Sequence, residues 1–144
     1  MGISIRRDTI ASAAALNAVI AAVAHGRSLG KAVVAAVAGP SGDTIACLRA
    51  DGAFSASVDI ARDKAYTAAV FGASTDQLCQ ALEHRQVLRE GIALRPRVVL
   101  FGGGLPIVEE GRIIGAIGVS GGSEDDDRAC AAAGLSVLGI GPAA

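Results

Sequence analysis

The sequence contains very few aromatic residues: three phenylalanines, one tyrosine and no tryptophan among 144 residues. Apolar residues nevertheless make up 51% of the chain. Its core must therefore be built from alanine, valine, isoleucine and leucine. A chain of this length is long enough to bury such a core within one domain. We therefore expect a single domain over residues 1–144.

Residues that commonly bind metal ions are also scarce. The three cysteines lie far apart and form no CxxC pattern, which argues against a zinc site or a disulfide framework. The consecutive aspartates 125–127 would point about 100° apart on a helix and could not converge on one ion. We therefore expect no metal site. The chain has two histidines, His25 and His84, and Met1 is the only methionine.

The chain has no long apolar run and almost no net charge. No run approaches the roughly 20 residues that cross a bilayer, and the first residues lack the apolar region of a signal peptide. A net charge of -1 gives no electrostatic attraction to nucleic acid. We therefore expect a soluble, cytoplasmic protein with neither a membrane nor a nucleic acid as partner.

Apolar spacing and capping residues predict four helices. The first runs from Asp8, its expected N-cap, to His25 before Gly26, and the second covers residues 57–71 before Gly72. A third helix starts at Ser74 and continues towards Arg89. The last starts at Ser123, where residues 123–126 fit a capping box with acidic residues in the first turn.

Five short apolar runs separated by glycine-rich or charged breaks predict five strands. These runs are residues 32–38, 44–49, 98–101, 105–108 and 113–119. Because most of them follow one another along the chain, they predict an α+β fold with a five-stranded antiparallel sheet flanked by helices. The last run is apolar on both faces. Either helices cover both of its faces or one face meets another subunit.

Two features near the predicted strand ends allow two interpretations each. Gly102, Gly103 and Gly104 could bind an anion through backbone N–H groups, or could form a tight connection that requires positive φ. Lys64 lies on a helix face among apolar neighbours. Its amine could reach water or a carboxylate, or it could line a pocket and meet an anionic ligand.

Polar residues near these strand ends could form one catalytic constellation. Lys64, Asp51 and Arg97 are the catalytic candidates, and a desolvated lysine could act as a base. The candidate ligand-binding residues are Arg49, Thr67, Gly103, Gly104 and Glu109. Such a site could isomerise, hydrate or deaminate a small carboxylate metabolite without a cofactor.

Several motifs resemble those of a known family. The stretch GGGLPI at residues 102–107 is followed by an acidic turn, by GAIGVSGG at residues 115–122 and by an Asp-rich helix start. The segments RADGA at residues 49–53 and DKAYTA at residues 63–68 add to the likeness. Together they resemble the haem-degrading domain family, which is also called GlcG/HbpS-like and is related to the C-terminal domain of PduO proteins.

The resemblance implies a profilin-like fold of α/β/α layers, a homo-oligomer and binding of haem or another tetrapyrrole. Some haem-binding relatives use a histidine on the first helix, so His25 is the candidate axial ligand; otherwise it is a surface or C-capping histidine. Three functions stay open. The chain could bind haem or another small anionic ligand in an apolar pocket, with a haem-degrading or redox-sensing role. It could be the cofactor-free enzyme described above, or an oligomeric accessory protein of a catabolic operon.

Overall fold

The computed structural model describes residues 2–141 and contains five helices and four strands over that range. The elements in chain order are α1 (Ser12–Ser28), β1 (Val34–Ala38), β2 (Thr44–Arg49), α2 (Ala56–Phe71), α3 (Thr75–Ala81), α4 (Gln86–Ala93), β3 (Gly104–Glu109), β4 (Arg112–Ser120) and α5 (Glu124–Val137). None of the helices in this range is long and apolar enough to cross a membrane.

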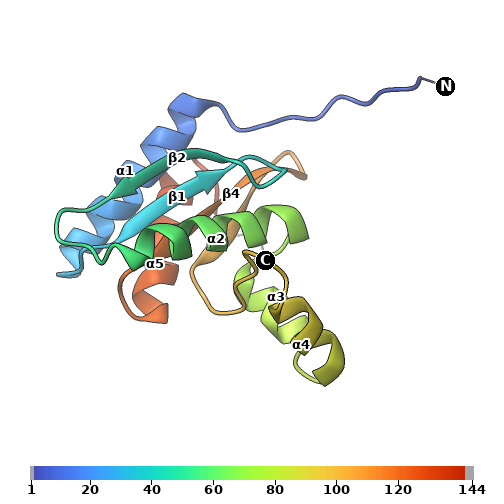
Figure 1. Cartoon of the computed structure of the whole chain (residues 1–144). Helices are drawn as coiled ribbons and strands as arrows, with labels where there is room; N and C mark the ends of the chain where they lie inside the picture. Colours follow the sequence, from blue (N-terminus) through green and yellow to red (C-terminus); the bar gives the residue numbers. More distant parts are fainter. Residues whose placement is uncertain (1, 142–144) are drawn as a thin grey trace.

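The strands form one antiparallel sheet in the order β2-β1-β4-β3. Helix α2 packs on one face of the sheet, and α1 and α5 pack together on the other face (Figure 1). The expected α+β class with an antiparallel sheet is therefore confirmed. Strand β4 is buried from Ile114 to Ser120, so helices cover both of its faces. Of the two possibilities for this apolar strand, helix cover on both faces is therefore the one that the fold shows.

The sheet has four strands, and the prediction of a fifth at residues 98–101 is wrong. The backbone there bonds to side chains instead of a neighbouring strand: the Val99 N–H donates to Thr67 Oγ1 over 3.0 Å, and the Gly102 N–H donates to Glu124 Oε1 over 3.1 Å. Arg97, just before this segment, has a φ of 68°. These side chains satisfy the backbone groups that a strand would have paired with its neighbour.

Close packing between α2 and β4 depends on the absence of a side chain at Gly118. A Cβ atom built there would run into the carbonyl oxygen of Ala61 and would lie 2.5 Å from the Ala65 nitrogen. Helix α2 therefore lies directly on the strand backbone. A core that lacks large aromatic residues gains contact area from such close approach of backbones.

The first helix begins and ends later than the sequence predicted. Asp8 is not its N-cap: its carboxylate pairs with Arg112 over 2.9 Å, and the Ile10 N–H donates to the Ile114 carbonyl over 2.9 Å. Residues 8–11 therefore lie extended beside β4, and α1 begins at Ser12. At the other end Gly26 lies inside the helix, and Gly30, with a φ of 73°, follows the C-cap and ends it.

The predicted third helix is two helices, α3 and α4. Ser74 caps α3 in a capping box with Gln77, as expected for its start. Leu82 is buried just after α3, whereas α4 contains no buried residue, so the chain turns away from the body between them. Residues 83–85 are Glu, His and Arg, and nothing in that composition signalled the break.

Thr67 on α2 connects to segment 97–101 through its hydroxyl group. Its Oγ1 accepts the Val99 N–H and lies 2.9 Å from the Arg97 carbonyl oxygen. Replacing it by valine keeps the shape but leaves the buried Val99 N–H without a partner. We expect Thr67→Val to lower the free energy of unfolding by about 1–3 kcal/mol, measured by urea denaturation.

Thr67→Ser is the matched control, because it keeps the hydroxyl and removes only a methyl group. We expect a smaller loss for serine than for valine. An equal or larger loss for the serine variant would mean that packing, and not the hydrogen bonds, makes Thr67 important.

Candidate functional site

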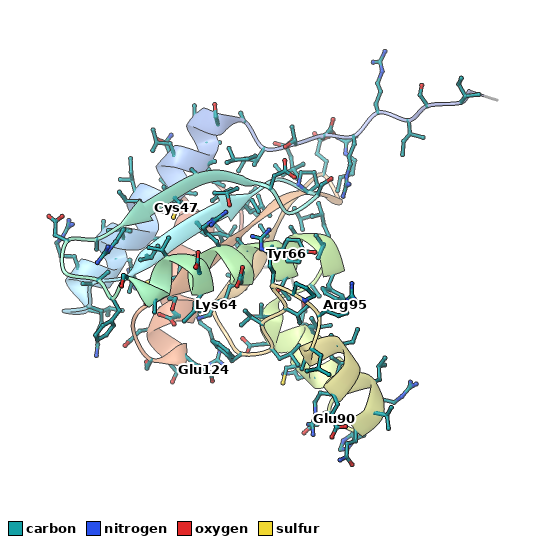
Figure 2. The ribbon with its side chains drawn as sticks, viewed as in Figure 1. Cys47, Lys64, Tyr66, Glu90, Arg95 and Glu124 are labelled. Carbon is teal, nitrogen blue, oxygen red and sulfur yellow. The ribbon has the colours of Figure 1, made fainter. Side chains whose placement is uncertain are left out.

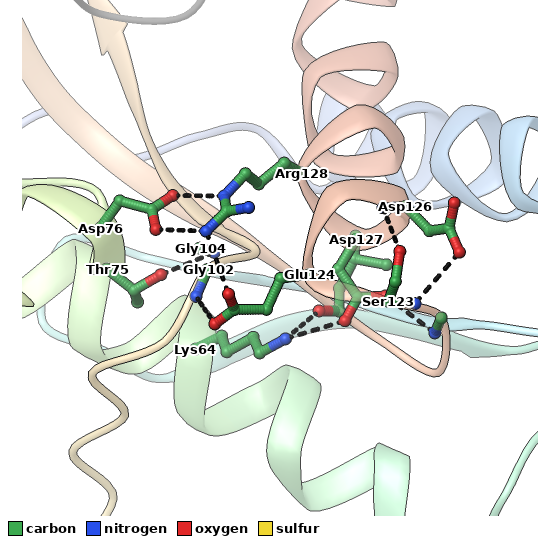
Figure 3. Close-up of polar contacts among 12 residues, drawn as sticks. Lys64, Thr75, Asp76, Gly102, Gly104, Ser123, Glu124, Asp126, Asp127 and Arg128 are labelled. Carbon is green, nitrogen blue, oxygen red and sulfur yellow. Dashed lines mark hydrogen bonds and ion pairs between the residues drawn. The ribbon is translucent and has the colours of Figure 1, made fainter.

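Lys64 is fully buried and forms an ion pair inside the protein. Its Nζ donates to Asp127 Oδ2 over 3.1 Å and to the Val119 carbonyl oxygen over 2.8 Å (Figure 3). The exposed fractions of the two charged side chains are 1% and 6%. The pair joins α2 to α5 at the end of β4. Of the interpretations from the sequence, pairing with a carboxylate is the one that this geometry fits.

Burial is the main influence on the pKa of both partners. It lowers the pKa of Lys64, and the charge of Asp127 opposes that shift. It raises the pKa of Asp127, although the Gly122 N–H and the Lys64 ammonium both stabilise the carboxylate. Each charge therefore costs free energy to bury, and each depends on the other for compensation.

Gly103, the middle glycine of residues 102–104, lies against this pair. Gly103 has a φ of 121°, and a Cβ atom there would lie 2.8 Å from Lys64 Nζ. The N–H groups of Gly102 and Gly104 donate to Glu124 and Thr75, both over 3.1 Å. Because these donors are used within the protein, the loop fits a tight connection with positive φ better than an anion-binding loop.

A charged groove of about 380 Å³ lies beside the glycine loop. Arg128 forms two hydrogen bonds of 2.8 Å to Asp76, and these hold the pKa of Asp76 below its usual value. Glu83 and Glu124 add two more carboxylates, and Arg89 adds a second guanidinium. Phe101 also lines the groove, and its ring centre lies 5.1 Å from Lys64 Nζ. This groove is therefore polar and rich in acidic groups.

The remaining predicted polar residues do not gather in this groove. Arg97 pairs with Asp63 over 3.0 Å and lies 4.3 Å from the Tyr66 ring centre, close to Thr67. The Arg49 guanidinium donates to the Ala53 carbonyl oxygen in the turn that contains Asp51. Asp51 and Glu109 line two different hollows. The structure thus brings Lys64 close to Gly103 and Gly104, and Thr67 close to Arg97, whereas the catalytic and ligand-binding roles stay predictions.

His25 lies in the last turn of α1, on the face of the sheet opposite α2. It is half-buried and lines a shallow hollow of about 680 Å³ together with Ala129, Ala132, Ala133, Ser136 and Val137 of α5. Within residues 2–141 its imidazole has no hydrogen-bond partner. The other histidine, His84, is 91% exposed beside Glu83.

Asp127 has a different role from the other acidic residues in the first turn of α5. The three aspartates diverge: Asp125 pairs with Arg128, Asp126 accepts the Ser123 N–H in the expected capping box, and Asp127 turns inwards to Lys64. A signal was present in the sequence. Asp127 continues the buried stripe of α5 that also contains Cys130, Ala131, Gly134 and Leu135.

The ion pair generates a test of stability. Lys64→Met would leave the buried Asp127 without its cation, and we expect a loss of about 3–5 kcal/mol in the free energy of unfolding. The double variant Lys64→Met/Asp127→Leu removes both charges and should recover most of that loss. A double variant as unstable as the single one would show that the pair does not compensate two buried charges.

The stability of the Lys64→Met variant should also depend on pH. A carboxylate in an ion pair loses its stabilising effect as the pH falls, whereas the unpaired Asp127 should become less destabilising. Without the ammonium, burial raises the pKa of Asp127 further above its unfolded value of about 4. The native state then binds more protons than the unfolded state within that window, so stability rises as the pH falls through it. Urea denaturation should find a smaller deficit for Lys64→Met at about pH 5 than at about pH 7.

The sequence and the fold both resemble those of known proteins. The sequence pattern of the family described as "Haem degrading protein HbpS-like" matches residues 10–136. An uncharacterised 15.0 kDa protein of Citrobacter freundii, from the dhaT-dhaS intergenic region, is 39% identical over 88% of this chain and 90% of its own length. A crystal structure of a double mutant of HbpS from Streptomyces reticuli superposes with a TM-score of 0.86 at 33% identity, covering 96% of this chain and 92% of that one.

A second solved structure, the PduOC:heme complex, has a TM-score of 0.85 at 26% identity and covers 94% of this chain and 99% of that chain. The whole PduO corrinoid adenosyltransferase of Salmonella typhimurium is 30% identical over 84% of this chain, which spans only 36% of that enzyme. The family match covers most of the sequence and agrees with the fold of both solved relatives. The chain belongs to the HbpS-like family.

Proposed function

We propose that the chain binds haem or a related tetrapyrrole on the surface between α1 and α5, with His25 as an axial ligand of the iron. The supporting relatives are the HbpS-like family itself and the neighbouring PduOC:heme complex. The observation that carries the proposal is the half-buried imidazole of His25, which has no hydrogen-bond partner within the described chain and opens onto an apolar hollow. Neutral imidazole nitrogen is a common haem ligand.

The shape of the hollow supports a flat, apolar ligand. Ala129, Ala132 and Ala133 project only methyl groups from α5, so a planar ring could approach the helix closely. Val137 adds apolar surface at one end of the hollow. Contact between these side chains and a porphyrin face would remove apolar area from water on both partners.

The charged groove beside Lys64 is less suited to haem. Asp76, Glu83 and Glu124 would repel the propionates, and Arg128 is already bonded to Asp76. The groove does not contain a histidine among the residues that line it. Binding at His25 therefore has the better chemical support of the two.

Bound haem would supply the redox chemistry of its iron. A haem-degrading or a redox-sensing role would both require it. The cofactor-free enzyme has less support, because Lys64 is 1% exposed and Asp127 occupies its amine. Asp51 and Glu109 also lie at separate hollows.

The first test is a haemin titration followed by absorption spectroscopy. We expect saturable binding with a shifted Soret band, and its loss or a weakening of at least about tenfold in His25→Ala. His84→Ala is the matched control, because it removes the other histidine, which is exposed. Equal shifts in the wild type and both variants would place the iron ligand elsewhere, and no shift in the wild type would end the haem proposal.

The second test addresses the hollow itself. Ala132→Glu would place a larger, charged side chain on the surface where the ring is expected to lie, and should weaken haemin binding by at least about tenfold. Ala93→Glu, the same change at an exposed position of α4, should leave the affinity unchanged. Full affinity of the Ala132→Glu variant would exclude this face as the site.

A further inference from the structure

Residues 2–7 form an extended arm that leaves the body of the molecule (Figures 1 and 2). Its root is fixed, because the Arg7 guanidinium donates to Ser41 Oγ over 3.2 Å and to the Pro40 carbonyl oxygen over 3.1 Å. Beyond the root, Ile3 is 107% exposed and Ile5 is 93% exposed. Two isoleucines in water on the same arm indicate a segment that another surface covers.

The pattern of the arm is that of a half-buried strand. Ile3 and Ile5 alternate with Ser4 and Arg6. In an extended chain, residues two apart point to the same face, so the isoleucines form one apolar side and Ser4 and Arg6 the other. Such a segment can add to the free edge of a sheet through its backbone while its apolar side fills a groove.

Strand β2 offers a free edge of this kind. It is the outer strand of the sheet and pairs only with β1 within the described chain. One row of its backbone N–H and C=O groups therefore has no partner in the sheet. The opposite edge strand, β3, is less receptive because Pro106 has no N–H to donate. Strand β2 has no proline.

An apolar hollow of about 490 Å³ lies beside this edge, between β2 and α1. Leu16, Ile45, Ala46 and Cys47 line it, and Leu16 is 52% exposed. Ile45 and Cys47 are two residues apart on β2 and point to the same face of the sheet. A strand added beside β2 would bring its own alternate side chains next to these two, about 4.5–5.5 Å away between Cβ atoms.

We propose that the N-terminal arm of one copy of this chain pairs with the outer edge of β2 in a second copy and places Ile3 and Ile5 over this hollow. The arm of the same copy is less suited, because its root is fixed at the turn between β1 and β2 and the arm runs away from the sheet. Reciprocal exchange of two arms gives a closed dimer with two-fold symmetry.

Disulfide trapping between two different copies tests the contact directly. The donor copy carries Cys47→Ser together with Ile3→Cys or Ile5→Cys, and the acceptor copy carries a mass tag and keeps Cys47. Mixing under mild oxidation should give a disulfide-linked species that contains one donor and one acceptor. Because the donor lacks Cys47, a bond to Cys47 in this species can only form between copies.

Two controls define the outcome of the trapping experiment. A donor with Ser4→Cys should give much less product, because that side chain points to the opposite face. An acceptor with Cys47→Ser should give none, although Cys79 and Cys130 are still present. Failure of both the Ile3→Cys and Ile5→Cys donors, or product that persists without Cys47 on the acceptor, would overturn the proposal.

Sedimentation provides a second measurement without introduced cysteines. The variant Ile3→Ser/Ile5→Ser should raise the dissociation constant of the dimer by about a hundredfold. The matched control Val87→Ser/Leu94→Ser changes two apolar residues that are 84% and 85% exposed and should leave it unchanged. A wild-type protein that stays monomeric, or equal weakening in both variants, would contradict the exchange of arms.

Discussion

The ion pair between Lys64 and Asp127 is the contact on which the two helical layers depend. Helices α2 and α5 lie on opposite faces of the sheet, and these two side chains meet at the end of β4, where the Val119 carbonyl oxygen also accepts from the amine. Gly103 leaves the space that the ammonium occupies. Because both charges are buried, removing one of them leaves the other buried without a partner, which lowers the stability of the fold.

Small residues allow close packing of the helices and the sheet around this contact. With 3% aromatic residues, the protein cannot fill its core with large rings. It brings backbones together instead, as at Gly118, where α2 rests on β4, and at Gly134, where a Cβ atom would lie 3.0 Å from the Ala18 carbonyl oxygen of α1. The same use of small residues produces the alanine-lined surface beside His25, which we propose for haem, on the face away from α2.

The proposed haem surface and the proposed arm contact use different parts of the molecule. His25 and α5 form the first, whereas the outer edge of β2 and the exposed side of Leu16 form the second. Both involve α1, which therefore presents one surface to a ligand and another to a second copy. Exchange of arms would leave the hollow at His25 open, so dimerisation and haem binding would be separable properties.

The sequence by itself determined the elements whose signals are local. Ser123 and Ser74 predicted two helix starts, Gly72 predicted the end of α2, and alternating apolar runs predicted the four observed strands. The motifs at residues 102–122 and the DKAYTA segment identified the family. These features are readable because capping, turn geometry and strand alternation depend on residues a few positions apart.

Only the tertiary structure determined the hydrogen bonds and ion pairs between residues that are far apart in the sequence. Apolar residues 98–101 look like a strand, but the hydroxyl of Thr67 takes the Val99 N–H that a neighbouring strand would have used. Asp8 looks like an N-cap but pairs with Arg112. Asp127 and Lys64 are separated by 63 residues, and no local rule connects them. Their pairing follows from packing across the sheet, which brings together groups that spacing along the chain cannot relate.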